Sequence, residues 1–201
     1  MAPLTSQTAI IEIGLDEASP SPVGSTLALG VGKSVPIPVI RSDHDVLVRV
    51  LAVALNPTDF KMVTYFPNMG SNNPIGCDFC GIVEDGCDET LVSFPKGTKV
   101  FGGLFPYGRT EKDGYAISGA FAEWVIADAN QLLRLPPHWS PLDGAAVGGI
   151  CWGTCVLGLF ADPEALALTG RPSAPDAKGP AVLVYGGATA TGTMACQLLK
   201  L

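Results

Sequence analysis

The sequence predicts a chain of the α+β or α/β class, in which an antiparallel, barrel-like β domain precedes the first βα unit of a parallel α/β domain. Two observations lead to this prediction. Short apolar and β-branched runs, separated by glycine and proline turns, fill residues 1 to 135, as is typical of antiparallel barrels. From residue 140 onward the pattern changes to a helix, a linker, a buried-strand run and a second helix.

The strands of the first part follow from runs of apolar and β-branched residues. Val46 to Leu55 is almost continuous and is broken only by Arg49, so it predicts a strand covered on both faces. The run stops at Asn56-Pro57, because proline cannot donate to a strand ladder. The other predicted strands are residues 9–13, 77–84, 99–101 and 121–126.

The second part opens with a helix start signal at Ser140-Pro141-Leu142-Asp143, and this helix is expected to end near Phe160. Residues 181–185 then predict a buried strand, and a second helix begins near Thr191. Strand, turn and helix open a βαβ unit, but no partner strand follows in the sequence. We therefore expect a chain that is truncated at its C-terminus, or whose final part is poorly ordered.

Composition and charge exclude several classes of protein. Hydrophobic residues make up 47% of the 201 residues and charged residues 15%, which argues against a disordered chain or a coiled coil. The formal net charge of −7 offers no basic face for nucleic acid or an anionic membrane. Residues 144–161 and 179–199 are uncharged and long enough to span a bilayer, but their glycines and small polar residues favour buried structure.

The cysteines and histidines predict neither disulfides nor a metal site. The N-terminus lacks a signal-peptide pattern, so we expect a reducing, cytoplasmic location and free thiols. Cys77 and Cys80 form a single C-x-x-C pair, and His44 and His138 sit beside no second ligand. Structural zinc needs four ligands, which this pattern does not supply.

Two polar segments are candidates for chemistry, and each has an ordinary alternative. Residues 185–193, Tyr-Gly-Gly-Ala-Thr-Ala-Thr-Gly-Thr, follow a predicted strand and open a helix, where backbone N–H groups can bind a phosphate. The strict G-x-G-x-x-G spacing is missing, so a plain tight turn stays open. Residues 56–61 would bring polar groups to a barrel rim, or form only an Asx/Pro turn.

Taken together, five segments resemble the medium-chain dehydrogenase/reductase superfamily. They look most like its zinc-free, quinone-oxidoreductase-like branch, and within it the trans-acting enoyl reductases of fungal polyketide synthases and their peptide-synthetase hybrids. The segments are AVALNPTDFK at 52–61, IGCDFCGIV at 75–83, KVFGG at 99–103, GAFAEWVIAD at 119–128 and VLVYGGATATGTMACQLLK at 182–200.

The resemblance implies two domains and no metal. Residues 1–150 would be a GroES-like substrate domain, and residues 151–201 the start of an incomplete NADP-binding Rossmann domain. Zinc-dependent members place Cys-His-Thr-Asp where this chain has residues 56–59, Asn-Pro-Thr-Asp, and Gly-His-Glu where it has residues 76–78, Gly-Cys-Asp. The resemblance therefore implies hydride transfer without a Lewis acid.

The resemblance also implies an activity, a cofactor and a partner. A monomer would use NADPH to reduce an α,β-unsaturated thioester on the carrier domain of a polyketide synthase or a synthase–peptide-synthetase hybrid. NADP rather than NAD comes from the resemblance alone. Two alternatives stay open: a truncated family member without activity, and a zinc-independent quinone or aldehyde reductase.

Site residues follow position by position from the resemblance. Lys61 would place a cation near the nicotinamide ribose or the developing enolate, unless it is simply a solvated lysine. Thr154 would orient a carbonyl by one hydrogen bond, unless it bonds its own helix backbone. The implied cofactor-binding residues are Thr58, Asp59, Phe60, Lys61, Gly187, Ala188, Thr189, Ala190 and Thr191. The implied substrate-binding residues are Cys155, Val156, Leu157, Gly158, Leu159, Phe160, Ala161 and Asp162.

Overall fold

The computed structural model divides the chain into two compact units, Met1–Gly149 and Ile150–Leu201. The structure describes residues 5–14, 27–66, 72–107, 118–163, 165–170, 173–176 and 178–200.

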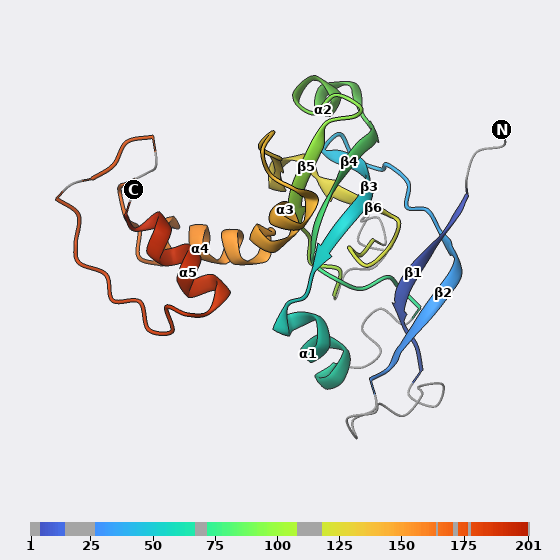
Figure 1. The fold of residues 1–201 in the computed structure, drawn as a ribbon, viewed down its shortest axis with the longest axis horizontal. Helices are drawn as coiled ribbons and strands as arrows, with labels where there is room; N and C mark the ends of the chain where they lie inside the picture. The colour runs from blue at the N-terminus through green and yellow to red at the C-terminus, as the bar shows by residue number, and fades with distance from the viewer. Residues whose placement is uncertain are drawn as a thin grey trace. The chain divides into compact units, whose positions relative to one another are not determined.

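The first unit is built on antiparallel β-structure (Figure 1). Its larger sheet has the strand order β6-β3-β4-β5-β7, and β1 and β2 form a separate two-stranded sheet. The strands are β1 (Ser6–Glu12), β2 (Leu29–Pro36), β3 (Asp45–Ala54), β4 (Asp78–Gly86), β5 (Lys99–Gly103), β6 (Trp124–Asp128) and β7 (Leu132–Arg134). The helices of this unit are α1 (Pro57–Tyr65), α2 (Asp88–Ser93), α3 (Pro141–Val147) and the short 3-10 helix η3 (Ala129–Gln131).

The core of the first unit lies against the β3–β4 pair. On one face the fully buried side chains come from alternate positions of β3, β4, β5 and β6, as the pleat of a strand requires. They include Val48, Phe79, Val100 and Val125. On the other face α3 packs on β3, β4 and β5, and Ala145 joins a smaller core with Cys80 and Phe101.

The strands predicted from apolar runs are present, with one difference in how β3 is covered. Each of the five runs predicted in the first unit overlaps one strand. These strands are β1, β3, β4, β5 and β6. Leu51 and Val53 are each 40% exposed, so the expectation of a strand covered on both faces is wrong for the second half of β3. An antiparallel strand can leave one face open, whereas a continuous apolar run predicts two covered faces.

Two sequence expectations about helices need correction. Residues 57–61, considered as a turn at a barrel rim, form the first turns of α1, with Pro57 at a position where a missing N–H costs little. The helix expected from 141 to 160 is interrupted, because Gly148 takes a positive φ of 57° and ends α3. A second helix, α4, begins at Ile150.

The second unit pairs two helices, α4 (Ile150–Phe160) and α5 (Ala190–Leu198). Their contact buries Cys155, Leu159 and Leu198. Among the described residues, the run Pro141–Phe160 is long and apolar enough to cross a membrane by length and composition, and 28% of its most apolar window is buried. The break at Gly148 divides this run.

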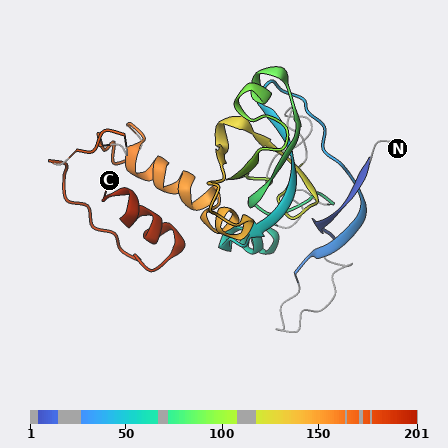
Figure 2. The ribbon, with the colours of Figure 1, turned by 45° about the horizontal axis from the view of Figure 1, so that its top comes forward.

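The strand predicted at residues 181–185 does not form. Residues 181–184 have no regular structure and lead as an extended coil into the turn before α5 (Figure 2). Leu183 is 92% exposed and Tyr185 is 100% exposed. A strand is defined by hydrogen bonds to a neighbour, and within the described part of this unit no strand lies beside these residues. The sequence pattern alone could not supply that partner.

We expect Phe79→Ala to lower the free energy of unfolding by about 3–5 kcal/mol, because a fully buried ring at the centre of the β3–β4 face leaves a cavity. Urea denaturation followed by circular dichroism measures this loss. Val92→Ala on α2 is the control, since Val92 is 82% exposed and its removal is expected to shift stability by less than about 0.5 kcal/mol. Equal losses for the two variants would contradict the position given to Phe79.

Candidate functional site

Sheet topology brings three separate segments of the first unit together at one end of the β3–β4–β5 group. Asp78 at the start of β4 pairs with Ala54 at the end of β3 and with Gly103 at the end of β5. The segments that continue from these positions, 55–61, 76–78 and 104–107, therefore lie close together. They contain the first turns of α1 and the polar side chains described next.

The first turn of α1 presents one side chain inward and others outward. The Asn56 N–H donates to Asp59 Oδ2 at 2.8 Å, and the Asp59 N–H donates to the Asn56 carbonyl at 3.0 Å. Asp59 is buried, whereas Phe60 and Lys61 are exposed. Successive helix positions point about 100° apart, so anchoring Asp59 turns the next two side chains toward solvent. Of the predicted cofactor residues, Asp59 is therefore a structural anchor in this unit.

Tyr107 links Asp59 to the segment before β4. Its hydroxyl donates to Asp59 Oδ1 at 3.1 Å and accepts from the Gly76 N–H at 3.3 Å. The ring is buried and lies edge-on against Phe105. Burial, followed by the negative charge of Asp59, raises the pKa of the Tyr107 hydroxyl well above its ordinary value. The hydroxyl is therefore a fixed proton donor to Asp59 at any physiological pH.

Cys77 is the neighbouring buried thiol. Burial raises the pKa of Cys77 far above its ordinary range, and the charge of Asp59 and a hydrogen bond with it raise it further. A thiol with such a pKa stays protonated, whereas a metal ligand or nucleophile must be a thiolate. Cys77 is consequently inert in this environment.

Asp78 completes the cluster through two donors. Asn56 Nδ2 donates to Asp78 Oδ2 at 2.8 Å, and the Gly149 N–H donates to Asp78 Oδ1 at 2.9 Å. The positions that the resemblance aligns with zinc ligands are thus hydrogen-bonded to each other and to the backbone. Among the described residues, no three His, Cys, Asp or Glu side chains gather as they would around a metal ion.

This arrangement does not fit a catalytic zinc ion. A neutral thiol at Cys77 and an amide at Asn56 are poor replacements for the thiolate and imidazole ligands that zinc prefers. We derive no step through a metal, and the expectation that the protein holds no zinc stays a prediction.

In the second unit, the turn before α5 is held by hydrogen bonds of the Thr189 side chain. Gly186 takes a positive φ of 86°, and the Thr189 hydroxyl accepts from the Gly192 N–H at 3.0 Å while donating to the Gly186 carbonyl at 2.9 Å. A Cβ on Gly192 would collide with the Gly186 carbonyl oxygen, so only glycine allows this close approach.

Four backbone N–H groups around this turn have no partner among the described residues. They belong to Gly187, Ala188, Ala190 and Thr191, four of the five predicted cofactor positions here. The Thr189 side chain is engaged in capping α5. Free N–H groups at a helix N-terminus can bind a phosphate through their dipoles.

The structure also brings α4 beside this turn. The Cys155 thiol donates to the Thr191 carbonyl at 3.2 Å, and the Thr191 hydroxyl lies 3.7 Å from the Cys151 sulfur. Burial, followed by the neighbouring Cys151, raises the pKa of Cys155. Thr154, the predicted carbonyl-orienting residue, is exposed on α4.

The predicted substrate-lining stretch is divided between the core of the second unit and its surface. Cys155 and Leu159 are buried against α5, and Phe160 packs beside them. Leu157, Gly158 and Asp162 are exposed, and Val156 and Ala161 are half-buried. A ligand that meets α4 within this unit would reach the exposed group first.

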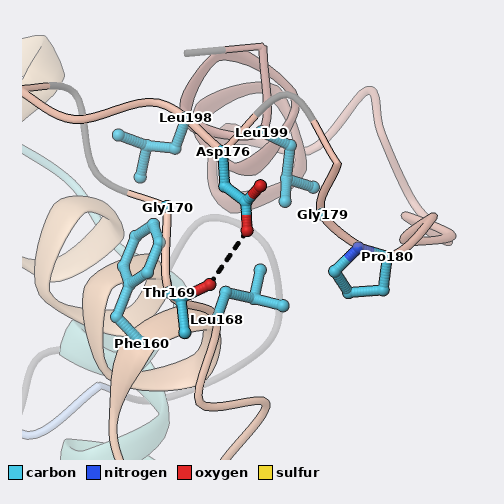
Figure 3. Close-up of a pocket in the computed structure, with 9 residues that line it drawn as sticks. All are labelled: Phe160, Leu168, Thr169, Gly170, Asp176, Gly179, Pro180, Leu198 and Leu199. Atoms are coloured by element: carbon cyan, nitrogen blue, oxygen red, sulfur yellow. Dashed lines mark hydrogen bonds between the residues drawn. The ribbon is translucent and has the colours of Figure 1, made fainter.

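A small hollow opens at the far end of α4 and α5 (Figure 3). Apolar side chains of Phe160, Leu168, Leu198 and Leu199 line it, and the Thr169 hydroxyl donates to Asp176 Oδ2 at 3.0 Å beside them. Of the predicted site residues, this hollow contains only Phe160.

The sequence analysis missed Tyr107 and the two donors to Asp78, which are Asn56 Nδ2 and the Gly149 N–H. Tyr107 stands in Leu-Phe-Pro-Tyr-Gly after β5, a stretch without a motif. Its role depends on a contact across 48 residues of chain, which no local pattern reports. The alignment of Gly76-Cys77-Asp78 with a metal-ligand segment was the one available signal for Asp78.

Several known proteins resemble this chain in sequence. Residues 42–137 match the alcohol dehydrogenase GroES-like domain. Trans-enoyl reductase calK of Penicillium decumbens is 48% identical over 204 residues, covering 97% of this chain and 51% of that protein. Trans-enoyl reductase sthE of Phaeosphaeria nodorum is 46% identical over 201 residues, covering 100% of this chain and 51% of that protein. The chain thus spans about half the length of the curated relatives it matches.

Solved structures share the fold. A putative zinc-dependent alcohol dehydrogenase protein from Rhizobium etli matches with a TM-score of 0.66 at 26% identity, covering 97% of this chain and 50% of that one. A quinone oxidoreductase from Pseudomonas syringae matches with a TM-score of 0.62 at 21% identity, covering 95% and 49%. These findings confirm the predicted fold class and the resemblance to the medium-chain superfamily and its fungal trans-enoyl reductases.

We expect Tyr107→Phe to lower the free energy of unfolding by about 1–3 kcal/mol, because it leaves a buried Asp59 oxygen and the Gly76 N–H without their shared partner. Tyr65→Phe is the matched control on exposed α1 surface and is expected to change nothing measurable. Urea denaturation of both variants gives the comparison. A Tyr107→Phe protein as stable as the parent would mean that this hydroxyl is not the link described.

We expect the first unit to lose stability as pH rises above 9. Burial raises the pKa of Cys80 from 9.0 to about 11, partly opposed by Lys99 and the Gly81 N–H, and it raises the pKa of Cys77 further. Above pH 9 the unfolded chain releases these protons while the folded chain keeps them, so each group costs roughly 1 kcal/mol per pH unit.

Urea denaturation at pH 8, 9, 10 and 11 measures this slope. Cys77→Ala is expected to flatten it, whereas Cys196→Ala, which removes an exposed thiol, leaves it unchanged. A slope that does not change in Cys77→Ala would contradict the buried protonated thiol.

Proposed function

We propose that this chain is part of an NADPH-dependent enoyl reductase. It is a member of the medium-chain dehydrogenase/reductase superfamily and a homologue of the fungal trans-enoyl reductases. The observation that carries the proposal is the 46–48% identity to two trans-enoyl reductases over nearly the whole chain. In this proposal residues 1–150 form the GroES-like substrate domain and residues 151–201 begin the NADP-binding domain.

The turn at residues 186–192 is proposed to bind the cofactor pyrophosphate. Its unpartnered N–H groups supply donors, and the close approach of Gly192 to Gly186 gives the phosphate access to the backbone. Thr189 contributes by capping α5 and holding the turn in shape. When bound, NADPH would supply the hydride for the β-carbon of an α,β-unsaturated thioester.

Lys61 and Thr154 are proposed to act on the substrate and the nicotinamide end of the cofactor. Lys61 is exposed on α1, whose first turn is held by Asp59 and Tyr107. A cation held near the carbonyl oxygen or ribose stabilises negative charge that develops during reduction. The Thr154 hydroxyl is exposed on α4 and would donate one hydrogen bond to a carbonyl. Thr58 and Phe60 share the α1 surface with Lys61.

The proposed substrate is an acyl thioester tethered to the carrier domain of a polyketide synthase or a synthase–peptide-synthetase hybrid. The reductase is proposed to be a monomer that acts in the cytoplasm. Support comes from the names of the relatives, since a trans-acting enoyl reductase serves a synthase that is a separate protein. The exposed part of residues 155–162 is the proposed wall for the acyl chain.

A second candidate function is the reduction of a free quinone or aldehyde. The structural likeness to a quinone oxidoreductase supports it. Kinetics with a panel of enoyl thioesters, quinones and aldehydes separate the two candidates. An enoyl reductase is expected to have a higher kcat/KM for the thioesters than for the quinones or aldehydes.

A chimera provides the test of activity. This chain replaces the matching half of trans-enoyl reductase calK, to which it is 48% identical, and NADPH oxidation is followed with a crotonyl thioester. Turnover supports the proposal, and a folded chimera that binds NADPH without reducing the thioester overturns it. The 201-residue chain alone is expected to bind NADPH weakly, because residues 181–184 lack a partner strand in the described structure and the site is not enclosed.

In the chimera, Lys61→Ala is expected to lower kcat on the order of 10²-fold through lost charge stabilisation, with little loss of stability. Lys33→Ala, an exposed lysine on β2, is the matched control and is expected to keep full turnover. Steady-state kinetics and thermal unfolding are measured together. Unchanged turnover in Lys61→Ala would identify this lysine as a solvated surface residue.

A further inference from the structure

Asp78 contacts the chain at two points that precede the helices of the proposed function. Its buried carboxylate accepts from Asn56 Nδ2 through Oδ2 and from the Gly149 N–H through Oδ1. Asn56 is the residue before α1, and Gly149 is the residue before α4. One side chain therefore holds the backbone before α1 and the backbone at Gly149, the last residue of the first unit.

The backbone packed against this carboxylate is rich in glycine. A Cβ on Gly148 would collide with the carboxylate, and Gly148 has a positive φ that favours glycine. A Cβ on Gly103 would lie 2.8 Å from Asp78 Oδ1 and 2.9 Å from the Gly149 Cα. Three glycines thus let two backbone segments close around one side chain. Tightly packed groups pass displacements to their neighbours.

We propose that Asp78 is a positioning residue that couples the first turn of α1 to the Gly148–Gly149 backbone. It does so through the hydrogen bonds that it accepts from Asn56 Nδ2 and from the Gly149 N–H, and this role requires no contact with substrate or cofactor. The inference rests on the proposed function only for what α1 carries, namely Lys61. Small misplacements of reacting groups slow catalysis strongly. Weakening the hydrogen bonds to Asp78 is therefore expected to lower kcat more than it raises KM.

Amide hydrogen exchange in the 201-residue chain tests the coupling without any enzyme activity. Asn56→Ala removes the donor to Oδ2, and no hydrogen bond joins Asn56 to Gly149 in the described structure. If Asp78 couples the two segments, exchange at the Gly149 amide rises several-fold in this variant, on the order expected for one weakened hydrogen bond. Unchanged exchange at Gly149 would overturn the proposal.

A swapped pair gives the second test. Asp78→Asn presents one oxygen and one NH₂ group to two donors, so one hydrogen bond is lost and exchange rises at α1 or at Gly149. In the double variant Asn56→Asp with Asp78→Asn, the new amide donates to the new carboxylate and its oxygen accepts from Gly149. Exchange is expected to return close to the parent value. A double variant that exchanges as fast as Asp78→Asn alone would contradict the assigned contacts.

Asp85→Asn is the matched control. It makes the same chemical change on the same strand, at an exposed ion pair with Lys96. It is expected to leave exchange at α1 and Gly149 unchanged, because exposed pairs contribute little to stability. Faster exchange at both segments in this control would show that general loosening of the sheet, and not Asp78, accounts for the effect.

Kinetics in the calK chimera give the functional readout. Asp78→Asn is expected to lower kcat about tenfold and to change KM less. The swapped pair is expected to restore most of the lost kcat. Exchange that responds as predicted while kcat of the swapped pair stays as low as in Asp78→Asn would overturn the positioning role. A folded chimera that binds NADPH but does not reduce the thioester would count against the proposed function alone, since the exchange experiments do not depend on it.

Discussion

Two carboxylates, Asp59 and Asp78, are buried where β3 and β5 end and β4 begins, and both must find hydrogen-bond donors there. A buried carboxylate without donors costs several kcal/mol, so the surrounding chain is constrained to supply them. Asp59 receives the Tyr107 hydroxyl and the Asn56 N–H, and Asp78 receives Asn56 Nδ2 and the Gly149 N–H. Asn56 serves both, which fixes the direction in which α1 leaves the sheet.

This network joins the segments that the resemblance aligns with zinc-ligand segments. Here the same segments are joined by neutral and charged hydrogen bonds, and the one thiol among them, Cys77, stays protonated. The free faces of α1 are left to Phe60 and Lys61, which carry no part of the network.

Short sequence patterns predicted the strands and helices whose formation depends mainly on neighbouring residues in the chain. β3, β4 and β5 follow from β-branched runs, and α3 begins at the predicted Ser140 cap with its Asp143 partner. β2 was not predicted, because two glycines interrupt its apolar pattern. Residues 56–61 were ambiguous, since Asn-Pro opens a turn as readily as a helix.

Features that depend on distant partners could not be predicted in this way. The apolar run at 181–185 has strand composition, yet no strand lies beside it in the described structure. Tyr107 has no local signal, although it links two predicted site segments. The resemblance supplied the positions of residues 58–61 and 187–191. The structure showed that Asp59 and Thr189 bind backbone groups, and that the N–H groups beside Thr189 have no partner among the described residues.

The full exposure of Tyr185 on unpaired backbone has a practical consequence. Exposed loops are the preferred sites of proteolytic cleavage, and residues 181–184 lead into a turn that begins at this fully exposed tyrosine, a residue type after which chymotrypsin cleaves. Pairing of this segment with a neighbouring strand would remove that access. The rate of cleavage after Tyr185 is therefore a direct measure of whether a sheet has assembled around the segment, and it needs neither cofactor nor substrate.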